Sequence, residues 1–191
     1  MKKFIFWASA AIAALVLGAG STALILKSNT LTGGVRSGSW GTNLAIGSEE
    51  AGLYTRAIVA VYGLLALSKE ETIYYTAGTD DSGAPLSGDC TYRLEGKDLD
   101  ARWWSITAYG PDSFLMDTGA DHYSVSQTSI AKESDGSFTV RVSAKPQEGN
   151  WLPVKAGQSF DVMARFYNPG PAIYESPETA PLPAIVKETC E

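Results

Sequence analysis

The sequence has little of the material from which catalytic and metal sites are built. Its 191 residues include a single histidine, His122, and two cysteines, Cys90 and Cys190. Catalysis of the Ser–His or Cys–His type would have to use His122, which follows a turn and is expected at the surface. One histidine and one distant cysteine pair make a poor ligand set for a metal. We therefore assign no catalytic residue, no metal site and no cofactor from the sequence.

Longer catalytic signatures are also missing. The sequence contains no H-E-x-x-H motif, nucleophile elbow, P-loop or dinucleotide-binding fingerprint. Residues 79–83, TDDSG, lack the spacing of a calcium loop and predict a hairpin turn. Residues 114–121 contain one Asp-Thr-Gly, the signature of aspartic proteases, but no second copy and no later supporting segment, so we interpret them as a turn. The paired carboxylates of glycoside hydrolases have no fixed sequence spacing, and that class stays open.

Charge is absent from one long stretch near the N-terminus. Residues 4–26 are uncharged, follow Lys2 and Lys3, and reach the length of about 20 residues that crosses a bilayer as a helix. A retained signal anchor and a signal peptide cleaved near residues 18–20 are both open; we favour the anchor, because the apolar run continues past that point. The expected location is the bacterial inner membrane, with the N-terminus cytoplasmic and the domain periplasmic. Secretion to the periplasm after cleavage is the alternative.

Acidic residues outnumber basic ones in the exported part. Of the 15 basic residues, Lys2 and Lys3 precede the apolar run, so 13 basic side chains remain against 21 acidic ones. This balance argues against nucleic acid as a partner. In an oxidising compartment Cys90 and Cys190 can form a disulfide that closes a loop of about 100 residues. Two free thiols are the alternative.

The remaining patterns divide the chain into three parts: residues 1–27 as the anchor, 28–47 as a linker and 48–191 as a periplasmic domain. Residues 48–67 predict a helix with Ser48 as its N-cap, and its apolar second half, residues 57–67, is expected to be buried. Apolar residues then recur with a period of two. The predicted strands are residues 71–77, 90–96, 102–110, 122–127, 137–144 and 160–169. Short strands separated by Gly and Pro turns predict a mainly β fold, an antiparallel β-sandwich or jelly-roll-like barrel with one packed helix.

Side chains alternate faces along a strand, and this sorts the predicted strands into two faces. One face is apolar and predicts the core: Trp104, Ile106, Ala108, Phe138, Val140, Val142, Ala144, Val162, Ala164 and Phe166. The other face mixes aromatic rings, hydroxyls and one arginine, and its candidate ligand-binding residues are Trp103, Tyr109, Arg165 and Tyr167. Either this face lines a groove for a sugar or another small polar ligand, or the apolar helix covers it. We favour the covered face, because the helix needs a sheet to pack on.

Several motifs resemble a known family. YTRAIVAVYGLLAL, ETIYYTAGTDDSGAPLSGDCTYRLEG, ARWWSITAYGPDSFL, DGSFTVRVS, NWLPVKAG and ARFYNP occur in this order, and together they resemble the domain of unknown function 1214, in its short membrane-anchored bacterial form. The resemblance covers about residues 40–186 and implies a β-sandwich of jelly-roll type. It also implies a partner carrying the companion domain of unknown function 1254, which this sequence does not contain. No reaction can be carried over, and the tail lacks the tryptophan turn of longer members.

Two functions follow as expectations. The first is a membrane-anchored periplasmic binding or assembly subunit, working with a protein of the companion family or within a larger membrane complex. The alternative is an envelope carbohydrate-active enzyme or carbohydrate-binding module that uses the aromatic-polar face.

Overall fold

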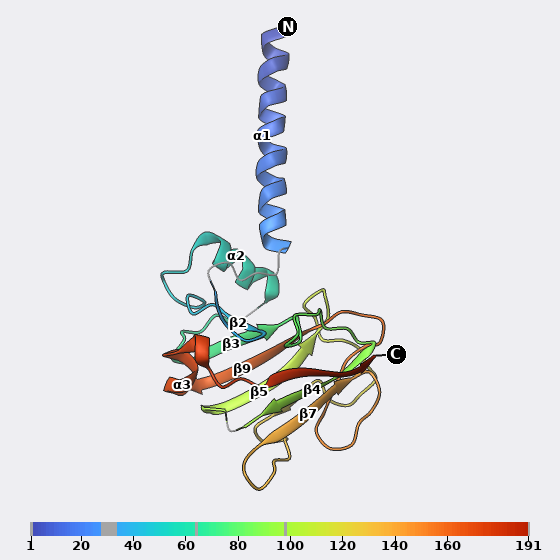
Figure 1. Ribbon diagram of the computed structural model, residues 1–191. Helices are drawn as coiled ribbons and strands as arrows, with labels where there is room; N and C mark the ends of the chain where they lie inside the picture. The colour runs from blue at the N-terminus through green and yellow to red at the C-terminus, as the bar shows by residue number, and fades with distance from the viewer. Residues whose placement is uncertain (1, 28–33, 64, 98, 191) are drawn as a thin grey trace.

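The computed structural model describes residues 2–27, 34–63, 65–97 and 99–190 (Figure 1). Helix α1 (Lys2–Lys27) projects away from the two sheets and is long and apolar enough to cross a membrane. The same length and composition fit a retained anchor and a signal sequence. The predicted helix over the uncharged run is therefore confirmed, while its fate after export stays a prediction.

Two β-sheets pack face to face and form the body of the protein. The first sheet has six strands in the order β1 (Val35–Ser37), β2 (Trp40–Thr42), β3 (Thr72–Ala77), β9 (Asp161–Pro169), β5 (Ala101–Tyr109) and β6 (Ser124–Ser126). The second has four, in the order β10 (Ala184–Cys190), β4 (Cys90–Gly96), β7 (Phe138–Ser143) and β8 (Trp151–Pro153). Neighbouring strands are antiparallel except β7 and β8. The mainly β sandwich is confirmed, and its jelly-roll type stays a prediction.

The core lies between the two sheets and contains the predicted apolar face. On the six-stranded sheet Trp104 lies opposite Phe166 and Ile106 lies opposite Ala164, and all four are buried. The Trp104 ring stacks on Phe138 of the other sheet, with centroids 5.3 Å apart. Burial of such aromatic side chains is a main source of stability in a sandwich of this size.

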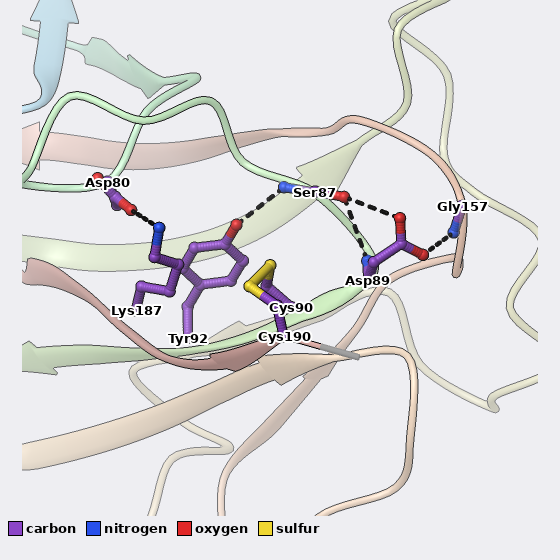
Figure 2. Close-up of a disulfide and its surroundings, with 8 residues drawn as sticks. All are labelled: Asp80, Ser87, Asp89, Cys90, Tyr92, Gly157, Lys187 and Cys190. Carbon is purple, nitrogen blue, oxygen red and sulfur yellow. Dashed lines mark hydrogen bonds and ion pairs between the residues drawn. A yellow bond between two sulfur atoms is a disulfide. The ribbon is translucent and has the colours of Figure 1, made fainter.

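A disulfide joins the last strand to the four-stranded sheet. Cys90 opens β4 and Cys190 closes β10, and the two residues lie directly opposite each other in the ladder. The predicted pairing is therefore confirmed. Figure 2 shows the bond beside Tyr92, whose hydroxyl accepts a hydrogen bond from the Ser87 backbone N–H at 2.9 Å. The loop before β4, strand β4 itself and the C-terminal strand β10 are thus held together near the disulfide.

The segment expected to be a linker and the C-terminal tail both contribute strands. The predicted linker over residues 28–47 is wrong from residue 35 onward, because β1 and β2 extend the six-stranded sheet and Trp40 is buried; residues 28–33 lie outside the described residues. The Trp40 indole N–H donates to the Pro183 carbonyl at 2.7 Å. The proline-rich tail, which the sequence predicts as irregular or extended, ends in the extended strand β10 along the edge of the second sheet.

The predicted helix over residues 48–67 is shorter and more exposed than expected. Helix α2 (Leu53–Tyr62) begins after Gly52, not Ser48, and ends at Gly63 in the left-handed conformation. Ser48 instead donates a hydrogen bond to the Ala45 carbonyl in a preceding turn. The prediction of a buried second half is wrong, because α2 packs through one narrow side, and both Val61 in the helix and Leu65 just after it are exposed to solvent. Two short helical turns, α3 (Pro171–Tyr174) and η1 (Pro177–Thr179), precede β10.

Candidate functional site

A pocket of about 1110 Å³ lies on the outer face of the six-stranded sheet. Its floor is formed by the central strands β3, β9 and β5. Residues of β1 and β2 line one part of the wall, and Val61, Gly63 and Leu65 at the end of α2 line another. The turn after β5, residues 110–115, completes it. The outer face is therefore hollowed and open, and our expectation that the helix covers it is wrong.

Arg165 lies at the centre of this floor because of the strand register. It pairs with Tyr74 of β3 on one side and with Ser105 of β5 on the other. Thr107 and Tyr109 follow Ser105 on the same face of β5, since every second residue points to the same side. The three strands therefore bring hydroxyl groups and aromatic rings around one guanidinium.

The guanidinium of Arg165 is held by hydroxyls and ring faces. One Nη donates to Thr107 Oγ1 at 3.2 Å, and the other donates to the Tyr109 hydroxyl. Its Cζ lies 5.2 Å from the Tyr109 ring centroid and 6.0 Å from that of Tyr74, within the range of cation–π attraction. Within the described part of the chain, no carboxylate lies within ion-pair distance of Arg165.

Tyr74 connects the floor of the pocket to the end of α2. Its ring is buried, and its hydroxyl donates to the Leu65 carbonyl at 2.8 Å. Burial raises the pKa of Tyr74, and the neighbouring Tyr167 raises it further, against the opposing effect of Arg165. The hydroxyl stays protonated at neutral pH and keeps donating, so this bond fixes the segment that forms the wall.

Three of the four candidate residues line the pocket. Tyr109, Arg165 and Tyr167 lie on its surface. Trp103 is not among the lining residues; it lies opposite Tyr167 in the ladder, with ring centroids 5.4 Å apart. The structure thus brings the candidates together but places Trp103 as a packing partner of Tyr167. That the three bind a ligand stays a prediction.

Sequence reasoning missed the apolar rim. Four side chains around the mouth of the pocket are strongly exposed, namely Val61 (63%), Leu65 (68%), Phe114 (72%) and Leu115 (48%). We define these four residues as the rim. Phe114 and Leu115 follow Ser113, whose φ of 66° turns the chain outward after β5. Alternation along a strand carries no information about such turns, so the exposure could not be read from the sequence.

The other residues considered in the sequence lie in loops. His122 is half-buried, with Nδ1 2.9 Å from Asp121 Oδ1 and Nε2 2.9 Å from the Trp151 carbonyl oxygen. The hydrogen bond to Asp121 and that to the backbone raise the pKa of His122. Asp117 is exposed, and Gly119 of the same turn has a φ of 73°, which agrees with a turn. None of these residues lines the pocket.

The buried carboxylate of the 79–83 segment serves its own turn. Asp80 Oδ1 accepts hydrogen bonds from the Ser82 N–H and hydroxyl and from the Ala84 N–H, at 2.6 to 3.0 Å. Burial acts to raise the pKa of Asp80, but these bonds and the nearby Lys187 outweigh it and lower the pKa. The predicted hairpin turn is confirmed.

Comparison with known proteins shows a related fold and the family to which the chain belongs. The fold is a two-sheet sandwich, and it matches the crystal structure of the VPA0106 protein from Vibrio parahaemolyticus with a TM-score of 0.61 and 24% identity over 73% of this chain. The match covers 36% of that protein, so this chain spans little more than a third of its length. Residues 71–171, more than half of the chain, match the family described as "Protein of unknown function (DUF1214)", and the chain belongs to it.

The other comparisons add no function. An uncharacterized protein from Burkholderia cenocepacia gives a TM-score of 0.45 at 14% identity, covering 88% of this chain and 39% of that one. Comparison with curated proteins gives no match.

Proposed function

We propose that the protein is a membrane-anchored binding protein whose pocket takes a small organic anion. Arg165 is the observation that carries this proposal. A guanidinium has five N–H donors and is permanently charged; two of those donors reach Thr107 and Tyr109. The remaining donors are available to a carboxylate or phosphate, which a guanidinium binds in a bidentate manner. Among the described residues the half-buried Arg165 on the pocket floor has no ion-pair partner, and a bound anion would supply one.

The anchor and the compartment belong to the same proposal. The apolar helix α1 supports retention in the inner membrane, and the Cys90–Cys190 disulfide supports an oxidising compartment such as the periplasm. Assembly with a protein of the companion family stays a prediction of the resemblance.

Calorimetric titration of the full-length protein in phosphatidylcholine nanodiscs tests the proposal. The probes are hexanoate and the uncharged hexan-1-ol. We expect hexanoate to bind more tightly, and Arg165→Gln to weaken hexanoate by about 10- to 100-fold, the size of a lost charge-assisted hydrogen bond. Arg102→Gln is the matched control, because Arg102 is exposed and outside the pocket lining. Equal binding of hexanoate by both variants would refute the proposal.

A carbohydrate ligand is the second candidate, because the rings of Tyr109 and Tyr167 line the pocket beside Arg165. Aromatic faces stack on sugars, and arginine anchors their oxygens. Glucose and glucuronate in the same titration separate the two candidates. Binding of glucose with no binding of hexanoate would favour the carbohydrate.

A further inference from the structure

The proposed anion explains Arg165 on the floor of the pocket but does not explain the rim. Val61, Leu65, Phe114 and Leu115 expose between 48% and 72% of their surface around one opening. An exposed apolar cluster on an otherwise soluble domain marks contact with another apolar surface or ligand. The charged floor and the apolar mouth together define a site of mixed chemistry.

The rim lies at the end of the domain that is nearest α1. Helix α2 contacts α1, and Figure 1 shows α2 between the lower end of α1 and the side of the sheet formed by β2 and β3. The hydrogen bond from the Tyr74 hydroxyl to the Leu65 carbonyl holds the segment after α2 against the sheet. With α1 in a bilayer, this arrangement brings the mouth of the pocket to the membrane surface.

We infer that the pocket takes a single-chain amphiphile with a carboxylate head, exchanged with the bilayer. This inference rests on the proposed function and names its ligand class. The head binds the free N–H groups of Arg165, and the chain runs over Met163 toward the rim. The pocket volume of about 1110 Å³ slightly exceeds the roughly 300–1,000 Å³ typical of small-molecule sites, which leaves room for an extended acyl chain.

Chain length tests the inference. Full-length protein in phosphatidylcholine nanodiscs is dialysed against radiolabelled hexanoate, octanoate or decanoate, and the free concentration is measured in the outer chamber. Nanodiscs without protein report partitioning into the lipid alone, and nanodiscs with Arg165→Gln show how much of the remaining binding depends on Arg165. We expect the Arg165-dependent affinity, referred to the free aqueous ligand, to rise about fourfold for each added CH₂ group, as burial of a CH₂ predicts.

A substitution in the rim tests whether the alkyl chain of the ligand reaches the mouth of the pocket. Phe114→Ser is expected to weaken decanoate several-fold and to leave hexanoate unchanged, because the shorter chain does not reach the rim. Tyr123→Ser is the matched control, since Tyr123 is 43% exposed and does not line the pocket. Arg165-dependent binding that is equal for hexanoate and decanoate would overturn this inference and leave the proposed function standing. Absence of any Arg165-dependent binding would overturn both.

Discussion

Gly88 shows how closely the loops around the disulfide are packed. A Cβ at Gly88 would lie 1.9 Å from the Lys155 carbonyl oxygen, and the Gly88 N–H donates to the Gln158 carbonyl at 2.8 Å. The neighbouring Asp89 carboxylate accepts from the Gly157 N–H at 2.8 Å (Figure 2). The two loops are therefore in backbone contact, with no room for a side chain between them.

Gly88→Ala is expected to lower the free energy of unfolding by about 1–3 kcal/mol, the cost of overpacking a site that cannot relax. Gly41→Ala is the control, because its Cβ would meet nothing closer than the Thr76 carbonyl oxygen at 3.8 Å. Urea unfolding followed by far-UV circular dichroism measures both. Similar effects of the two substitutions would contradict the packing described for Gly88.

His122 gives a pH-dependent prediction at the same scale. Its pKa is raised from 6.5, mainly by the hydrogen bond to Asp121, so the folded protein binds this proton more tightly than the unfolded chain does. The stabilisation is full below the unfolded pKa and is lost as the pH rises through the folded pKa. His122→Gln should therefore cost more stability at about pH 5.5 than at about pH 8.5.

Urea unfolding of the wild-type protein and of His122→Gln at the two pH values measures how the cost of the substitution changes with pH. Groups that titrate in the same way in both proteins cancel in this comparison. In an Asp121→Asn background the difference between the two pH values should shrink, since the main cause of the shift is gone. A cost of His122→Gln that does not change with pH would show that the hydrogen bond to Asp121 does not matter to the folded state.

At the scale of elements, α2 is the clearest departure from the sequence prediction. Eleven apolar or small residues in a row predicted burial on all sides, yet only a narrow side containing Thr55 and Ile58 is buried. A sequence can indicate that a helix is apolar but not that its second face lies beside a pocket and near α1.

Ile58→Ala should lower the free energy of unfolding by about 2–5 kcal/mol, because Ile58 is only 3% exposed and a cavity would remain. Val61→Ala in the same helix should change it by less than about 0.5 kcal/mol, since Val61 is mostly in solvent. Thermal and urea unfolding in detergent micelles measure both. Equal losses for the two variants would restore the original prediction of a helix buried all round.

The sequence predicts some strands much better than others. The strands β4, β5 and β9 have seven to nine residues, enough for a period of two to show, and their ends are predicted within a residue or two. The three-residue strands β1, β2 and β8 lie in segments too short for a period to show, whereas β6, equally short, lies within the predicted strand over residues 122–127. Strand β10 pairs at an edge where most of its side chains are exposed. These segments are strands because they pair with distant parts of the chain, and the local sequence carries no pattern that predicts such pairing.

At the scale of the whole molecule, the disulfide closes the chain between the start of β4 and the end of β10. The sequence separation is 100 residues, so the bond removes much conformational freedom from the unfolded state. In the chain-entropy model a loop of this length contributes up to about 4–5 kcal/mol.

Replacing both cysteines, Cys90→Ser with Cys190→Ser, should therefore lower the free energy of unfolding by a few kcal/mol and leave the fold intact. The β4–β10 ladder still holds the tail in the folded state. Urea unfolding of the double variant measures the loss, and the dithiothreitol-reduced wild-type protein is the control for the substitutions. Equal stability of the oxidised protein and the double variant would mean that the unfolded chain is already constrained without the bond.

The sequence predicts part of the candidate site, namely the residues that strand alternation and register bring together. Period-two alternation places Tyr109, Arg165 and Tyr167 on one face, and the register then brings them together. The same alternation could not show that Trp103 packs beside the pocket, or that the 110–115 turn and the end of α2 raise its walls. Those features depend on how separate elements meet.

The central claim is that Arg165 binds the head of an acidic ligand in this pocket. A crystal structure of the full-length protein grown with decanoate tests it most directly. We expect a carboxylate oxygen within about 2.7–2.9 Å of the Arg165 guanidinium, with the chain directed toward Val61 and Phe114. At a decanoate concentration that saturates the protein, a pocket without ligand density, or a ligand whose carboxylate points away from Arg165, would contradict the account.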